Sequence, residues 1–208
     1  MFAITVSLSL SIWITSFAPA LAETYRIVGF GDSLMAGYQL RQGTGFTGQL
    51  QAALRKRGYD VVVENAGLSG DTTTGGLARL DWSVDGKPDL VILELGANDA
   101  LRGISPDITR RNLDTIIARL SERNIRVLLA GMLAPPNMGD NFANDFNAIY
   151  PELAAKHDIP LYPFFLDGVA ARAEYLLDDG MHPNVEGVAR MVSGILPQII
   201  EILENGTN

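Results

Sequence analysis

Hydrophobic residues fall into short apolar runs that alternate with longer stretches of helical spacing. The runs are rich in β-branched and large aliphatic residues, and each ends in a turn of glycine, proline or polar residues. This pattern is typical of strands buried on both faces of a parallel sheet. Five strands are predicted, over residues 25–30, 60–64, 90–95, 125–131 and 159–162, and Pro160 favours an edge position for the last.

The stretches between these runs have the spacing of amphipathic helices. Helices are predicted over residues 44–58, 142–157 and 185–203, with one more after a cap at Asp71 or Thr72 and another opened by Ser105 and Pro106. Strands that alternate with helices predict an α/β protein, here a three-layer α/β/α sandwich around a five-stranded parallel sheet. A length of 208 residues suits a single domain, which we place at residues 23–208.

The first 22 residues differ from the rest of the chain. They contain no charged side chain, and the Ala-Leu-Ala ending at residues 20–22 is a signal-peptidase pattern after which Glu23 would begin the mature chain. Because Lys and Arg are missing from the start of the segment, an uncleaved membrane anchor is the alternative. Pro19 and the cleavage pattern favour a signal peptide, and therefore export to the periplasm or secretion.

Composition narrows the function classes. The formal net charge is −8, and the densest basic run, residues 55–57, is predicted to be the exposed end of a helix, which argues against nucleic acid as a partner. There is no cysteine, so thiolate chemistry is excluded. With two histidines and no cysteine, a zinc site of ordinary composition is not expected, and we predict no metal.

Three predicted strands end in polar turns at the same edge of the sheet. Ser33 follows the first strand, Gly70 the second and Asn98 the third. Ligands of open parallel sheets bind at the carboxyl ends of the strands, so Ser33 is placed where a nucleophile would be useful. A turn of glycine, aspartate and serine is also ordinary loop chemistry, and both interpretations of Ser33 remain open on this pattern alone.

A serine nucleophile needs a base, and the chain has two histidines. His157 lies at a predicted helix end, where a solvated terminal histidine is the simpler interpretation. His182 lies in a turn three residues after Asp179, a spacing that allows the carboxylate to reach Nδ1 while Nε2 faces Ser33. The alternative is that the polar residues around His182 only form the turn and cap the next helix.

Four short segments together resemble one known family. Their order and spacing are those of the GDSL, or SGNH, hydrolases, most of all a small exported bacterial subgroup with thioesterase, arylesterase and lysophospholipase activities. The segments are Gly31-Asp32-Ser33-Leu34, Leu68-Ser69-Gly70-Asp71, Gly96-Ala97-Asn98-Asp99 and Asp179-Gly180-Met181-His182. Ala97 departs from the subgroup, which often has a second glycine there.

The resemblance implies a flavodoxin-like fold, no cofactor, and a role for each matched residue. Ser33 would be the nucleophile, His182 the general base and Asp179 the group that orients it. The oxyanion hole would combine the backbone N–H groups of Ser33 and Gly70 with the side-chain amide of Asn98. The neighbouring Asp32 and Asp99 are predicted to brace their turns, and the loops that hold Leu101, Met132 and Pro135 are predicted to contact the acyl group.

We therefore expect an exported serine esterase that acts on small acyl esters and thioesters, with lysophospholipids among its candidate substrates. It would act as a monomer without an obligate protein partner. Two alternatives remain: a carbohydrate acetylesterase, and a binding module that holds a lipid or glycan on the same fold without turnover.

Overall fold

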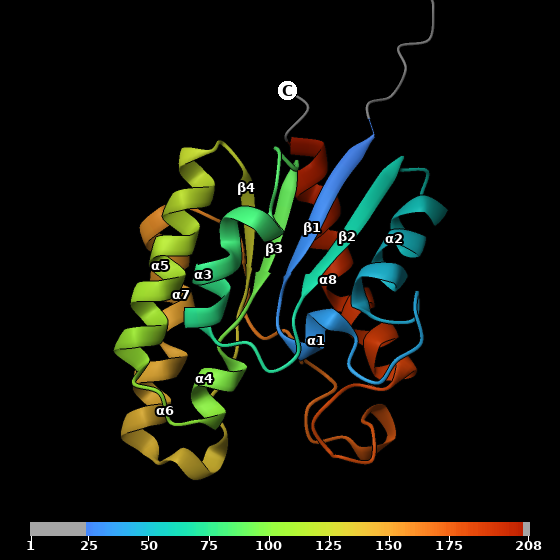
Figure 1. Cartoon of the computed structure of the whole chain (residues 1–208). Coiled ribbons are helices and arrows are strands. Elements are labelled where there is room, and N and C mark those ends of the chain that lie inside the picture. Colours follow the sequence, from blue (N-terminus) through green and yellow to red (C-terminus); the bar gives the residue numbers. More distant parts are fainter. Residues whose placement is uncertain (1–23, 206–208) are drawn as a thin grey trace, which may run out of the picture.

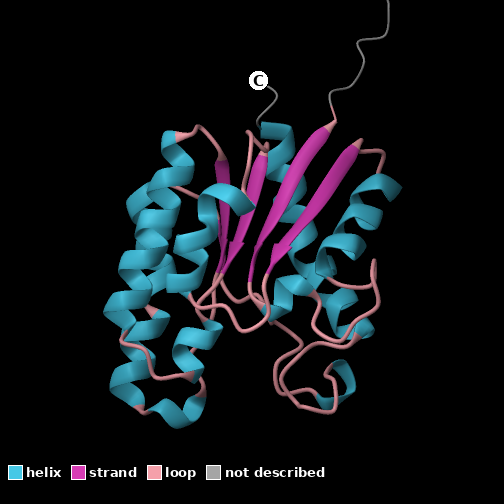
Figure 2. Ribbon diagram, viewed as in Figure 1, coloured by secondary structure: helices cyan, strands magenta, loops and turns pink. Residues whose placement is uncertain are grey.

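The computed structural model describes residues 24–205, and a parallel sheet of five strands runs through its centre (Figures 1 and 2). The strand order is β2-β1-β3-β4-β5, the flavodoxin-like order, and all neighbouring strands are parallel. The strands are β1 (Tyr25–Gly31), β2 (Val61–Gly67), β3 (Leu90–Glu94), β4 (Arg126–Ala130) and β5 (Leu161–Tyr162).

Helices cover both faces of the sheet. On one face α2 packs against β2 and α8, and on the other face α5 packs against α3, α7 and β4 (Figure 1). The α-helices are α1 (Ser33–Ala36), α2 (Phe46–Lys56), α3 (Thr73–Ser83), α4 (Ala97–Leu101), α5 (Pro106–Glu122), α6 (Asp140–Asn147), α7 (Ile149–His157) and α8 (Val185–Asn205), and 3₁₀ turns lie at η1 (Pro136–Met138) and η2 (Ala173–Tyr175). The predicted α/β sandwich with a five-stranded parallel sheet is thus confirmed.

The register of the sheet brings three strand ends to one level. Gly31 at the end of β1 pairs with Gly67 at the end of β2 on one side and with Glu94 at the end of β3 on the other. The turns after these strands therefore meet at one edge, next to α1 and α4. Both ends of the described chain lie at the opposite edge (Figure 1).

Three details of the prediction are wrong. Leu101, predicted to lie in a loop, is the last residue of the short helix α4. The helix predicted over residues 142–157 is two helices, α6 and α7, that meet at Ala148. Pro151 lies in the first turn of α7 and has no N–H to donate to the carbonyl of Asn147, so a continuous helix loses a hydrogen bond there. Strand β2 also continues to Gly67, beyond its predicted end at residue 64, because the pairing with β1 extends that far.

The predicted signal peptide, residues 1–22, lies outside the described residues. Within residues 24–205, none of the helices combines the length and the apolar character needed to cross a bilayer.

Candidate active site

Ser33 begins α1, a single helical turn directly after β1. The side chain of Asp32 caps this turn by accepting the backbone N–H of Leu34 at 3.0 Å, and Leu34 and Met35 are buried beneath it. Gly37 ends the turn with φ +77°, a left-handed conformation that glycine adopts without strain. The serine side chain is therefore held at the carboxyl edge of the sheet by a short element with fixed ends.

His182 and Asp179 lie next to Ser33, although 149 residues separate His182 from it in the sequence. The distance from His182 Nε2 to Ser33 Oγ is 2.8 Å, and the distance from His182 Nδ1 to Asp179 Oδ2 is 2.7 Å. The other carboxylate oxygen of Asp179 accepts the backbone N–H groups of His182 and Met181, and these hydrogen bonds lower the pKa of Asp179 to about 2. The three side chains thus form one hydrogen-bonded chain with a carboxylate at its end.

Asn98 and Gly70 lie in the turns after the neighbouring strands. Asn98 is on α4, and its Nδ2 donates to Asp32 Oδ2 at 3.0 Å, which uses one of its two amide hydrogens and leaves the other available. Gly70 has φ +80°, and a Cβ added there would contact only the guanidinium of Arg102, at 3.6 Å. Asn98 lines the same pocket as Ser33, whereas Gly70 is in the turn after β2 and is not one of the lining residues.

Buried carboxyl groups lie directly behind Ser33 and Asn98. Asp32 is fully buried, and burial raises its pKa to about 6 despite hydrogen bonds from Leu34 and Asn98. The backbone N–H of Asp32 donates to Glu94 Oε2 at 3.2 Å. Burial, and then the charge of Asp32, hold the pKa of Glu94 well above its ordinary range, and its Oε1 has no hydrogen-bond partner within residues 24–205.

Arg79 is a support that the sequence did not reveal. Its guanidinium donates to Asp71 Oδ2 at 2.6 Å and to the carbonyls of Gly31 and Ala66 at 2.8 Å, and it lies 4.3 Å from the ring centroid of Phe30. Arg79 thus joins the ends of β1 and β2 to the turn that holds Gly70. In the sequence, Arg79 stands between Ala78 and Leu80 in a predicted helix, a pattern that does not indicate its partners.

Asp99 braces the turn on the other side. It accepts the backbone N–H of Thr73 at 2.8 Å and the hydroxyls of Thr73 and Thr109 at 2.5 and 3.1 Å, so it joins α4 to the helices α3 and α5. Both Asp32 and Asp99 therefore accept backbone N–H groups, as their position in the turns predicted. Neither carboxylate is exposed to solvent.

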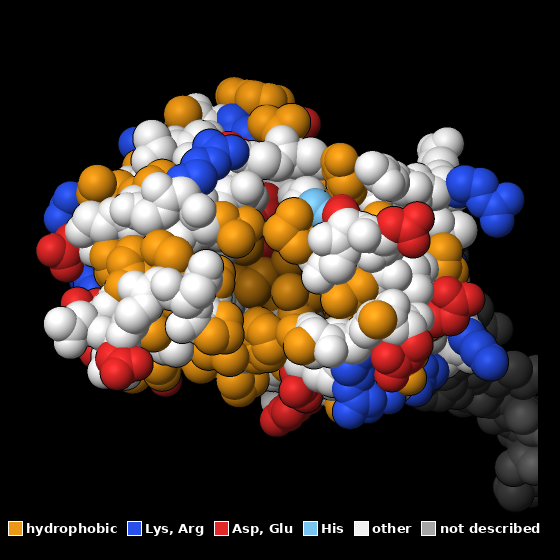
Figure 3. Space-filling view, turned by 90° about the horizontal axis from the view of Figure 1, so that it is seen from below, with side chains coloured by type: hydrophobic (Ala, Val, Ile, Leu, Met, Phe, Trp, Pro, Cys, Tyr) orange, Lys and Arg blue, Asp and Glu red, His pale blue; other side chains and the backbone are white. Residues whose placement is uncertain are grey.

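An apolar pocket opens beside Ser33 and His182. Its volume is about 630 Å³, within the usual range for small-molecule sites, and Figure 3 shows hydrophobic side chains around a hollow next to a histidine. Leu101, Met132 and Pro135 all line it; Met132 is buried, whereas Leu101 is half exposed. The remaining apolar lining comes from α1, α4, the loop after β4, and the segment between β5 and α8.

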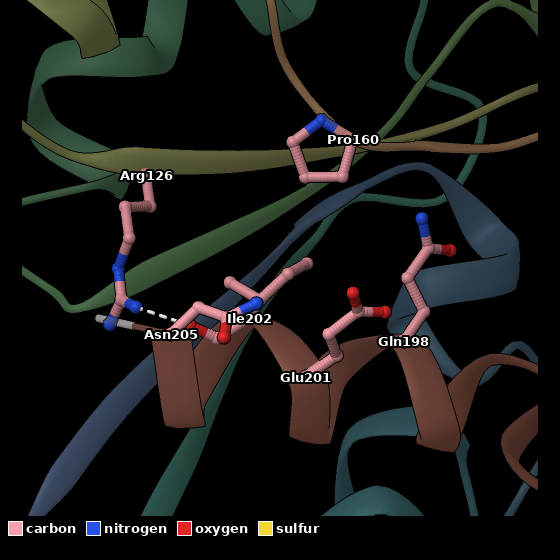
Figure 4. A pocket seen from close by; sticks show the side chains of 6 residues that line it. All are labelled: Arg126, Pro160, Gln198, Glu201, Ile202 and Asn205. Atoms are coloured by element: carbon pink, nitrogen blue, oxygen red, sulfur yellow. Dashed lines mark hydrogen bonds between the residues drawn. The ribbon is translucent and has the colours of Figure 1, made fainter. Parts of the chain in front are cut away.

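A second pocket lies at the opposite edge of the sheet (Figure 4). It has a volume of about 350 Å³ and is formed by the start of β4, Pro160 and the last turns of α8. The guanidinium of Arg126 there donates to the carbonyls of Asp89 and Ile202. None of the predicted site residues lines this pocket. His157 is also remote: it ends α7, and its Nε2 is 2.6 Å from Asp114.

A serine, an imidazole and a carboxylate in one hydrogen-bonded chain, at the carboxyl edge of a parallel α/β sheet, are the arrangement of a serine hydrolase. Comparison with known proteins agrees. A sequence model of the GDSL-like lipase/acylhydrolase family matches residues 30–190. The chain belongs to this family.

Named relatives have esterase and thioesterase activities. The chain is 38% identical to an arylesterase of Vibrio mimicus, over 86% of this chain and 90% of the relative. It is also 38% identical to thioesterase 1/protease 1/lysophospholipase L1 of Escherichia coli K12, over 81% of this chain and 79% of the relative. Among solved structures, the SGNH-hydrolase family esterase AlinE4 is similar, with a TM-score of 0.74, 44% identity, and coverage of 88% of this chain and 99% of AlinE4.

Proposed function

We propose that this protein hydrolyses acyl esters and thioesters by two-step acyl transfer through an acyl-Ser33 intermediate. The observation that supports this most is the hydrogen-bonded chain from Ser33 through His182 to Asp179, at the edge of an apolar pocket. The names of the relatives support the same class of reaction, the hydrolysis of esters or thioesters.

In the proposed first step, Ser33 Oγ attacks the carbonyl carbon of the substrate. Its proton passes to His182 Nε2, 2.8 Å away, and Asp179 stabilises the imidazolium through Nδ1. When the tetrahedral intermediate collapses, the bond between the carbonyl carbon and the alcohol oxygen or thiol sulfur breaks. The leaving group takes the electron pair of that bond and receives the proton from the imidazolium. Water then attacks the acyl-serine by the same route, which releases the carboxylic acid and restores Ser33.

The negative charge on the tetrahedral oxygen needs donors. We assign them to the backbone N–H groups of Ser33 and Gly70 and to the free amide hydrogen of Asn98. In support, Gly70 has no side chain to obstruct the approach of a substrate, and Asp32 holds the amide of Asn98 by its other hydrogen. Removing one such donor costs about 2.7–4 kcal/mol of transition-state stabilisation in known hydrolases.

We assign the acyl group to the apolar pocket, in contact with Leu101, Met132 and Pro135. A pocket of about 630 Å³ with a mostly apolar lining favours an acyl chain over a sugar, so an acyl hydrolase fits better than the carbohydrate acetylesterase. Lysophospholipids, which present one acyl chain, are among the candidate substrates. We further propose that residues 1–22 are a signal peptide, that residues 23–208 form one exported domain, and that the enzyme acts as a monomer.

The test is hydrolysis of p-nitrophenyl esters with acyl chains from acetyl to palmitoyl, by the chain that begins at Glu23 and by its Ser33→Ala variant. We expect activity in the first and its loss in the second, with a maximum at a chain longer than acetyl. A maximum at acetyl together with activity on acetylated sugars would favour the acetylesterase. A folded protein that hydrolyses no ester and does not react with a serine-directed fluorophosphonate would indicate the binding module.

A further inference from the structure

An aromatic ring lies against the face of the histidine in this site. The centroids of the Tyr38 and His182 rings are 4.4 Å apart, with 36° between the ring planes. Tyr38 lies outside the four segments that carry the resemblance to the family, and it does not line the pocket. Its hydroxyl forms no hydrogen bond with any residue from 24 to 205, and the residue is 37% exposed.

The backbone of Tyr38 is tied to Ser33. Gly37 turns the chain back at the end of α1, and the N–H groups of Gly37 and Tyr38 both donate to the carbonyl oxygen of Ser33 at 3.1 Å. The ring of Tyr38 then contacts His182, whose Nε2 is hydrogen-bonded to Ser33 Oγ. These contacts form a closed loop of three residues, with the nucleophile and the base both in it.

His182 needs such a contact because of the way in which it is held. It lies in an exposed turn after Gly180, which has φ +68°. Its two ring hydrogen bonds, to Asp179 and Ser33, are made by the nitrogens at the edge of the imidazole and do not contact the face of the ring. The ring of Tyr38, tilted by 36° to the imidazole, packs against it and restricts changes in the orientation of the imidazole.

We propose that Tyr38 is a positioning residue for His182, which holds the imidazole plane in the orientation for proton transfer and favours the imidazolium that forms in the transition state. A π face attracts a cation more than a neutral ring, so this contact strengthens as the proton moves from Ser33 to His182. An interaction that strengthens in the transition state raises kcat without a matching change in KM. The proposal rests on the proposed function, in which His182 is the base.

The kinetic test compares Tyr38→Leu and Tyr38→Gln, which remove the ring, with Tyr38→Phe, which keeps it. We expect the first two to lower kcat for a p-nitrophenyl ester by about 2- to 10-fold with KM changed less than about 2-fold, and Phe to restore kcat. Trp82→Leu is the matched control, because Trp82 is an exposed aromatic residue on α3 outside the site. If Phe is as impaired as Leu, or if Leu retains the wild-type kcat, the proposal is wrong.

A second readout needs no substrate. The chain has only two histidines, and His157 is remote from Tyr38. In proton NMR spectra, the imidazole signals of His157 therefore serve as an internal reference for those of His182. The ring current of Tyr38 acts on His182, and we expect the His182 signals to move in Tyr38→Leu and to stay near their wild-type positions in Tyr38→Phe, with His157 unchanged in both. Unmoved His182 signals in the Leu variant would contradict the contact itself, whereas an inactive wild-type protein with the expected shifts would contradict only the proposed function.

Discussion

Asp32 and Asp179 belong to the same site, yet their environments shift their pKa values in opposite directions. Burial raises the pKa of Asp32 to about 6, whereas hydrogen bonds from the backbone of His182 and Met181 lower the pKa of Asp179 to about 2. Asp32 belongs to what we call the serine half of the site, which holds Ser33 and Asn98. Asp179 belongs to the histidine half, the turn of residues 179–182.

The two halves are held by different means. Buried side chains anchor the serine half to the ends of the strands: Arg79 to β1 and β2, Asp32 to Asn98, and Asp99 to α3 and α5. The histidine half depends on contacts within its own turn, between Asp179 and the next three residues, on backbone hydrogen bonds with Leu177, and on the ring of Tyr38. Substitutions in the serine half should therefore affect stability and activity together, and those in the histidine half activity alone.

The largest effect is expected from Asp179→Asn. The amide cannot hold the imidazole in the tautomer that accepts the proton of Ser33, so kcat/KM should fall about 10³- to 10⁴-fold. The free energy of unfolding at pH 7 should fall only slightly, because the amide oxygen can still accept the backbone N–H groups of Met181 and His182, and solvent screens the charge that is lost. Ester hydrolysis and urea denaturation measure the two quantities, and Asp178→Asn, the exposed neighbour, is the matched control. A large loss of stability in Asp179→Asn would contradict the distinction between the halves.

Arg79→Met should have the next largest effect, on stability. It leaves the buried carboxylate of Asp71 without its partner, together with the carbonyls of Gly31 and Ala66, and breaking a buried ion pair costs about 3–5 kcal/mol. Arg119→Met, which breaks the exposed pair with Asp81, should cost less than about 1 kcal/mol. Equal effects of the two variants on the unfolding free energy would show that the buried anchor does not stabilise the serine half.

The partners of the buried side chains that anchor the serine half could not be predicted from the sequence, whereas the strands and most helices could. The alternation of apolar runs and helical spacing predicted the strands and most helices, because burial on both faces leaves a strong pattern. The polar turns predicted that Ser33 and Asn98 would share an edge. Arg79 left no such signal, since its partners lie at the end of β1 and in the stretch from the end of β2 to the turn after it. The contact between Tyr38 and His182 was invisible for the same reason.

The dependence of stability on pH should separate the two aspartates. A carboxyl whose pKa rises on folding binds protons more tightly in the folded state, so Asp32 makes stability decrease as the pH rises from about 4 to about 6. The shift from 3.8 to about 6 corresponds to about 3 kcal/mol. The lowered pKa of Asp179 has the opposite effect and acts over a different pH range. The stabilisation that the Asp179 carboxylate provides is lost when the pH falls from about 4 to about 2.

Urea denaturation at pH 4, 5, 6 and 7 tests this prediction. The free energy of unfolding of the wild-type protein should decrease from pH 4 to pH 7. In Asp32→Asn it should depend less on pH, even if the substitution also changes it by the same amount at every pH. Asp179→Asn should leave the slope between pH 4 and 7 as it is in the wild type. A slope that survives in Asp32→Asn would place the titrating group elsewhere, with Glu94 the first alternative, because its raised pKa acts in the same direction.

The smallest effect is expected at the rim, where both halves contribute to the pocket with similar exposure. Leu101, from the serine half, is 56% exposed, and Met181, from the histidine half, is 53% exposed. Each buried methylene contributes about 0.8 kcal/mol, so Leu101→Ala should lower kcat/KM for long acyl chains by about 3- to 10-fold and leave acetyl esters unchanged. Leu101 lies on α4, which Asp99 fixes to α3 and α5. Leu101 can therefore contact the acyl chain without the entropic cost of ordering a loop. Met181→Ala should therefore have the smaller effect on chain preference, and the reverse order would show that the histidine turn, and not the anchored helix, selects the acyl chain.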